Sequence, residues 1–221
     1  MSLLEELERS PGPQRQQGTI AGVVPAIITD NQDSEGLGRV KVRLPWLSEN
    51  NETDWIKVAT FMAGDGRGGF FLPENGDEVL VAFEQGNMNF PYVIGAVWNS
   101  EHPPPESNSD GNNTIRKITS RSGHEIVFCD DSEGSNEKIE IHTNGGHRIV
   151  LDDSSGSEKI EIEDSSGSNS ISIDSAQNSI AIESGTNLEI KSQNITIEAT
   201  ANLEVKASGN LKLEGAVVNI N

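Results

Sequence analysis

The second half of the chain repeats a short apolar triplet, and this repeat restricts the possible folds more than any other feature. In each triplet, two aliphatic residues flank a central residue that is usually polar. Because side chains alternate faces along a strand, each triplet predicts a short β-strand with two inward side chains and one outward side chain. Successive triplets start 7–9 residues apart, at Ile171, Ile180, Leu188, Ile195, Leu203, Leu211 and Val218. The outward positions are Glu140, Glu161, Ser172, Glu189, Thr196, Glu204 and Lys212.

Two longer units open the array, GHEIVF at 123–128 and GHRIVL at 146–151. Each is followed by an acidic turn and then by the triplet Ile-Glu-Ile, and Ser, Asn and Gly form the later corners. A period of about eight residues is too short for a helical repeat, so it favours a β-solenoid or β-prism.

One copy of this repeat buries its inward side chains only if it coils on itself or wraps around other copies. A single-chain solenoid needs about 20 residues per coil, whereas three chains with about eight residues each supply about 24 per layer. We therefore expect residues 114–221 to form an intertwined, homotrimeric β-helix or β-prism needle, with a single-chain solenoid as the alternative.

The first half has a different composition, because nine of the ten aromatic residues lie before residue 99. Aromatic side chains dominate compact cores, so this half is expected to be an ordinary globular domain. Five β-rich segments separated by turn clusters lie between residues 18 and 98. This pattern predicts a small closed barrel, for which an OB-fold is favoured and an SH3-like barrel is the alternative. The expected fold class is thus all-β, with an N-terminal OB-fold barrel followed by the needle.

Two further segments complete the expected organisation. Residues 99–113 are rich in Pro, Ser, Asn and Gly and are predicted to be a linker. Residues 1–17 include a short helical stretch whose apolar side chains, Leu3, Leu4 and Leu7, form a small sticky face. We expect this segment to dock on a partner, the alternative being a frayed terminus.

The formal net charge of -19 opposes binding to nucleic acid or to anionic membrane surfaces. No stretch reaches the apolar length of a membrane span, and the first residues lack signal-peptide features, so we expect synthesis in the cytoplasm without stable membrane insertion. The only cysteine, Cys129, is expected to be a buried free thiol.

Candidate metal ligands are few. His142 and His147 flank one turn and are candidates for a metal on a threefold axis, although packing histidines are favoured. The acidic turns at 130–131 and 152–153 lack the alternating ligand series of a Ca²⁺ loop. No nucleophile elbow, phosphate loop or zinc spacing occurs, so neither an enzymatic activity nor a cofactor is expected.

Residues 18–153 resemble the baseplate spike family, which includes phage baseplate assembly protein V, the spike of T-even phage tails and the VgrG proteins of type VI secretion. The string LPENGDEVLVAFEQG at 72–86 is specific for this resemblance. The resemblance implies a homotrimer that caps the tube and hub of a contractile injection machine, a phage tail or related apparatus, and pierces the target envelope.

Three departures from the family pattern shape the expected partners. Only 17 residues precede the barrel, so a separate hub protein is expected at the N-terminal end. No lysozyme domain lies between barrel and needle, which disfavours a spike that degrades cell walls. The apolar C-terminus has no histidine, so we expect no terminal iron site and instead a PAAR-type tip protein that binds Val217, Val218, Asn219, Ile220 and Asn221. The alternative function is a trimeric adhesin for surface glycans, which predicts exposed aromatic residues along the needle.

Overall fold

The computed structural model describes residues 20–47, 51–131 and 133–220. The chain divides between Gly111 and Asn112 into two compact units, and each is described by itself. All regular structure in the described residues is β-structure, apart from one 3-10 turn, η1 (Glu84–Gly86).

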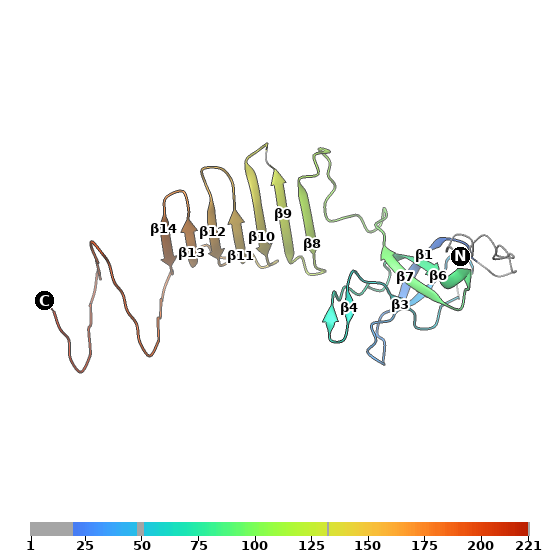
Figure 1. The fold of residues 1–221 in the computed structure, drawn as a ribbon, viewed down its shortest axis with the longest axis horizontal. Helices are drawn as coiled ribbons and strands as arrows, with labels where there is room; N and C mark the ends of the chain where they lie inside the picture. The colour runs from blue at the N-terminus through green and yellow to red at the C-terminus, as the bar shows by residue number, and fades with distance from the viewer. Residues whose placement is uncertain (1–19, 48–50, 132, 221) are drawn as a thin grey trace, which may run out of the picture. The chain divides into compact units, whose positions relative to one another are not determined.

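The first unit is a five-stranded barrel (Figure 1). Its strands are β1 (Val23–Asp30), β2 (Lys41–Arg43), β3 (Lys57–Val58), β6 (Glu78–Phe83) and β7 (Pro91–Ala96). They follow the order β2-β1-β6-β7-β3, and every pair is antiparallel except β3 with β7. Two hydrogen bonds between Val40 and Ile56, of 3.0 and 2.8 Å, join the two ends of this order. This closed order with one parallel pair confirms the predicted OB-fold.

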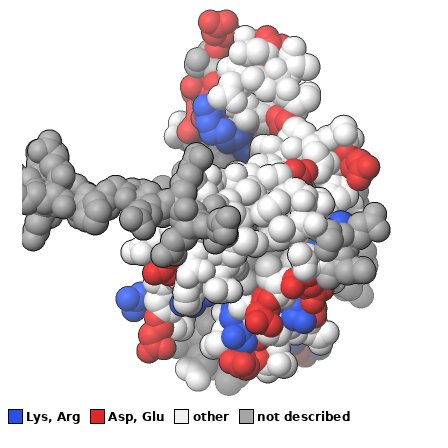
Figure 2. Space-filling view, turned by 90° about the vertical axis from the view of Figure 1, so that its right-hand side faces the viewer, with Lys and Arg blue, Asp and Glu red and all other residues white. Residues whose placement is uncertain are grey.

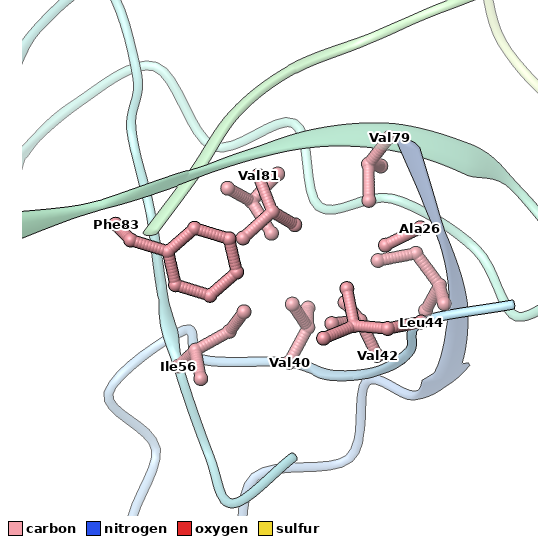
Figure 3. Close-up of a cluster of buried hydrophobic side chains, with 10 residues drawn as sticks. Ala26, Val40, Val42, Leu44, Ile56, Val79, Val81 and Phe83 are labelled. Carbon is pink, nitrogen blue, oxygen red and sulfur yellow. The ribbon is translucent and has the colours of Figure 1, made fainter. Parts of the chain in front are cut away.

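Aliphatic side chains fill the barrel, as Figure 3 shows. Alternate residues of β6, namely Val79, Val81 and Phe83, point inward because the strand has a period of two. Together they pack against a set of aliphatic residues from the other strands and their flanks, Ala26, Ile28, Val40, Val42, Leu44, Ile56 and Val93.

The predicted globular domain is present in the first half, but the expectation that aromatic side chains form its core is wrong. Phe83 is the one aromatic residue in the buried core of the described chain. Most other aromatic residues of this unit have exposed side chains, namely Trp46, Phe61, Phe70, Phe71, Phe90 and Trp98. A small barrel has a narrow interior that β-branched residues fill efficiently, so its aromatic residues are left for the surface.

Two loops of the barrel have well-defined conformations. In the β1–β2 loop, Arg39 donates two hydrogen bonds of 2.8 Å to the Asp33 carboxylate, which is almost fully buried. The same carboxylate accepts the backbone N–H groups of Glu35 and Leu37. These bonds, above all those from Arg39, hold the pKa of Asp33 far below its usual range. The second loop carries the hairpin β4 (Ala63–Gly64) and β5 (Arg67–Gly68).

The second unit begins with a seven-stranded antiparallel sheet in which every strand pairs with its neighbours in sequence (Figure 1). Its strands are β8 (Ile115–Thr119), β9 (Glu125–Asp131), β10 (Asn136–His142), β11 (Arg148–Asp152), β12 (Lys159–Glu163), β13 (Ser170–Asp174) and β14 (Ser179–Glu183). This arrangement differs from the single-chain solenoid considered above, since the described chain forms a meander and does not coil. The predicted free thiol of Cys129 is confirmed, and it is buried on β9.

The regular ladder stops at Glu183. Residues 184–220, which we call the terminal segment, contain no strand and no backbone–backbone hydrogen bond among the described residues. In Figure 1 this segment runs as a zigzag without strand arrows. The single domain expected over 114–221 therefore consists of a self-paired sheet and an unpaired continuation.

We predict that Ile28→Ala destabilises the barrel by about 2–4 kcal/mol, because it leaves a cavity in a closed core. Ile94→Ala is the matched control, since the Ile94 side chain is 45% exposed. Urea unfolding followed by tryptophan fluorescence measures both variants. Equal losses for the two variants would contradict the core described here.

Candidate assembly interface

One face of the seven-stranded sheet is apolar and is left uncovered by the chain that forms it. Strand register aligns its side chains in two rows, so that each residue lies beside its counterpart on the next strand. One row is Ile118, Ile126, Ile141, Ile149, Ile162, Ile171 and Ile182. The other row is Phe128, Ile139, Leu151, Ile160, Ile173 and Ile180. These residues, the apolar face, are 38–72% exposed.

The opposite face, the polar face, carries charged residues in ion pairs. Its central row contains Glu140, Glu161 and Ser172, which confirms that these three residues and the apolar face lie on opposite sides. Arg148 pairs with Glu161 at 3.2 Å and with Glu163 at 2.5 Å. The two carboxylates raise the pKa of Arg148, and the hydrogen bond to Glu163 has the larger effect. The sheet thus has one face suited to water and one suited to burial.

The terminal segment keeps the alternation of a strand although it pairs with no strand among the described residues. Glu189 pairs with Lys191, and Glu204 pairs with Lys206 at 2.7 Å, so residues two apart lie on one side. The flanking aliphatic residues, such as Leu203 and Val205, remain more than 60% exposed. Unpaired backbone groups and exposed aliphatic side chains together leave this segment incomplete in one copy of the chain.

The two candidate metal ligands, His142 and His147, have separate partners. His142 Nε2 on β10 lies 3.3 Å from Glu125 Oε2. His147, in the following turn, accepts the backbone N–H of Ser165 on Nδ1 at 3.1 Å. Over the ranges described, no group of three or more potential metal ligands is found. His124, which was not a candidate in the sequence, accepts a backbone N–H on Nδ1 as His147 does. The Gly-His pair that begins both GHEIVF and GHRIVL was the sequence signal for this shared role.

The other sequence-predicted sites lie at the two ends of the chain. Val217, Val218 and Ile220 are 50–84% exposed, whereas Asn221 lies outside the described residues, as do Leu3, Leu4 and Leu7.

In the acidic turns, Asp131 and Asp152 accept backbone N–H groups of their own turns, at 2.9 Å each. These carboxylates therefore have a structural role in the turns.

A second apolar surface lies on the barrel unit around a groove of about 580 Å³. Phe70 and Phe71 line it with side chains 78% and 66% exposed. The ring of Phe61, which is 80% exposed, lies 6.3 Å from that of Phe71 between centroids. The backbone at Gly69 packs closely against the Phe61 ring. A Cβ at residue 69 would lie 2.2 Å from that ring, so only glycine fits there without a shift of the ring. Figure 2 shows a face of the molecule on which uncharged residues predominate. Exposed apolar clusters of this kind are typical of protein–protein contact surfaces.

The fold and these surfaces define a class of protein: an OB-fold barrel followed by an antiparallel β-sheet with one exposed apolar face. Residues 24–98 match the type VI secretion system and phage-baseplate injector OB domain. No helix in the parts of the chain that the structure describes is long and apolar enough to cross a bilayer.

Curated relatives agree with the domain match. The chain is 30% identical to the type VI secretion system spike protein VgrG4b of Pseudomonas aeruginosa, over 59% of this chain and 19% of that protein. It is 32% identical to the spike protein VgrG3 of Vibrio cholerae, over 49% of this chain and 11% of that protein. The chain spans about a fifth or less of the length of these relatives. The chain thus contains an injector OB domain at residues 24–98 and is similar to type VI secretion spike proteins over about half of its length or more.

Glu125 gives the sheet a predictable response to acid. Lys117, Thr119 and His142 surround its carboxylate, and they lower its pKa below the ordinary 4.5. A depressed folded pKa contributes stability above the unfolded value, and this contribution is lost as the pH falls below 4.5 through the folded value.

We therefore predict that Glu125→Gln costs about 1 kcal/mol at pH 6 and close to nothing at pH 3. Thermal unfolding followed by circular dichroism at both pH values tests this. Glu137→Gln on the exposed surface of β10 is the control and should have little effect at either pH. A Glu125→Gln deficit that persists undiminished at pH 3 would refute the assignment.

Proposed function

We propose that the chain is the central spike of a contractile injection machine and acts as a homotrimer that pierces a target envelope. The exposed apolar face is the observation that carries this proposal. Burying a large aliphatic side chain stabilises a protein by roughly 1.5–3 kcal/mol, and this face presents two full rows of them. A sheet with such a face needs a cover of similar length and width.

Further copies of the same chain supply a matching cover. Each strand from β9 to β14 presents its apolar pair at the same register, so a second sheet offers an equally regular surface. The polar face then points to water on each copy, and its carboxylates contribute to the net charge of -19. That charge discourages side-by-side association of assembled spikes.

The terminal segment favours three copies over two. Two sheets packed face to face cover residues 115–183, but they leave residues 184–220 without backbone–backbone hydrogen bonds. Three chains that wrap around one axis supply about 24 residues per layer from a period of about eight, which closes a triangular cross-section. We infer that residues 115–183 pair within their own chain, whereas residues 184–220 pair between chains.

Two further proteins complete the proposed machine. A hub protein is proposed at the N-terminal end, with Leu3, Leu4 and Leu7 as its docking residues. A PAAR-type tip protein is proposed at the C-terminal end, where the exposed Val217, Val218 and Ile220 give it an apolar seat. A β-structure that three chains complete along its length, held in a baseplate, suits mechanical penetration.

We expect light scattering coupled to size exclusion to give three times the mass of the 23.8 kDa chain. The trimer should also survive brief exposure to SDS without heating, because chains that pair along residues 184–220 separate only by unwinding. A monomeric mass under native conditions would overturn the proposed function.

A pair of adjacent substitutions separates the two faces of the sheet. Ile162→Asp places a charge on the apolar face and should reduce the trimer fraction at least tenfold, because an unpaired buried charge is strongly unfavourable. Glu161→Gln alters the neighbouring residue on the polar face and should leave the trimer intact. Trimer fractions from size exclusion compare the two, and equal fractions would contradict the assignment of the faces.

A further inference from the structure

The turns at one edge of the sheet repeat a common set of hydrogen bonds. They join β8 to β9, β10 to β11 and β12 to β13, and we call this the turn edge. In each turn, the first residue donates its backbone N–H to the carbonyl of the last residue, at 2.8–3.1 Å. A side-chain oxygen of the first residue accepts the N–H of the last residue at 3.0–3.2 Å. The last residues, His124, His147 and Asn169, therefore occupy equivalent positions.

The side chains at these positions link each turn to the next turn along the edge. In every case, the acceptor lies on the side chain and the donor is a backbone N–H. The donor is the second residue of the next turn in the first two links and Gly185, two residues after the end of β14, in the third. The three links are His124 Nδ1 with Asn144 N at 3.3 Å, His147 Nδ1 with Ser165 N at 3.1 Å, and Asn169 Oδ1 with Gly185 N at 3.2 Å.

The links have the same geometry but different acid–base chemistry. A histidine accepts on Nδ1 only while that nitrogen carries no proton, whereas an asparagine oxygen accepts at any physiological pH. We propose that the turn edge is an acid-sensitive latch, in which the His124 and His147 links open on protonation and the Asn169 link stays closed. All three links lie within one chain, so this inference does not depend on the proposed trimer.

The charged groups on the elements next to these histidines restrict the pH range of the response. Beside His124, Glu125 follows directly at the start of β9, the neighbouring strand β10 carries His142, and Arg121 lies in the turn of His124 itself. Beside His147, Arg148 follows on the same strand, and Glu163 and Asp164 come from β12 and its turn. The pKa values of Glu125 and Asp164 are lowered by their own hydrogen bonds, so these two carboxylates stay charged where imidazole titrates.

His142 lies outside the turn edge, since its Nε2 faces the Glu125 carboxylate at 3.3 Å. Global stability reports on this contact as well as on the three links. The test therefore requires a measurement at the individual turns.

Hydrogen–deuterium exchange of the full chain provides this measurement. Protection factors, corrected for the intrinsic pH dependence of exchange, are compared at pH 7.5 and 5.0 for peptides that cover Asn144, Ser165 and Gly185. We expect protection to fall about fivefold at Asn144 and Ser165 on acidification and to stay constant at Gly185, which is the internal control. Constant protection at all three turns, or an equal loss at Gly185, would overturn the latch.

Asparagine substitution tests the histidines directly. His124→Asn with His147→Asn copies the chemistry already present at residue 169, so protection at neutral pH should be kept and the acid response lost. His142→Gln is the matched control and should leave the acid response of both turns unchanged. An acid response that persists in the double variant would also overturn the latch, because the titrating group would then lie elsewhere.

Discussion

An aliphatic sheet face left in water by its own chain is the constraint on which the rest of this structure depends. Seven strands keep their apolar side chains in register, yet nothing among the described residues of the second unit covers them. The polar face cannot take their place in the interior, since it carries ion pairs that would lose their hydration. The side of the sheet that must be buried is therefore determined within one chain, and only the covering partner has to be supplied.

The regularity of the meander explains why the sequence predicted the two faces well. Side chains alternate faces along a strand, so in a triplet such as Ile160-Glu-Ile162 the two isoleucines must lie on one face of the sheet and the glutamate on the other. Hairpin connections then repeat the same register from strand to strand. The GHEIVF and GHRIVL units differ from the later triplets mainly in the turn chemistry at their first residues. Of their histidines, His147 was a candidate metal ligand in the sequence, and both His124 and His147 accept a backbone N–H at a turn in the structure.

Other features could not be predicted because they depend on the partner of a segment and not on its own pattern. Ile180-Ala-Ile182 and Leu188-Glu-Ile190 are nearly identical as patterns, but the first pairs with β13 and the second pairs with nothing in the described chain. The burial of the aromatic residues in the first half was predicted wrongly for a related reason. Burial of Phe70 or Trp98 depends on the width of the barrel interior, which valine and isoleucine already fill.

The two units consequently differ in what they require to be stable. The barrel closes on itself and has a core of its own, so its stability is set by intramolecular contacts. The sheet and the terminal segment leave most of their aliphatic side chains exposed in one chain, so intramolecular contacts of the described residues give them no comparable core. In the proposed trimer, association would bury these side chains, and the stability of the second unit would then rise with the concentration of the chain. On that proposal the barrel can fold first, and the contact that completes the needle is also the contact that removes the apolar face from water.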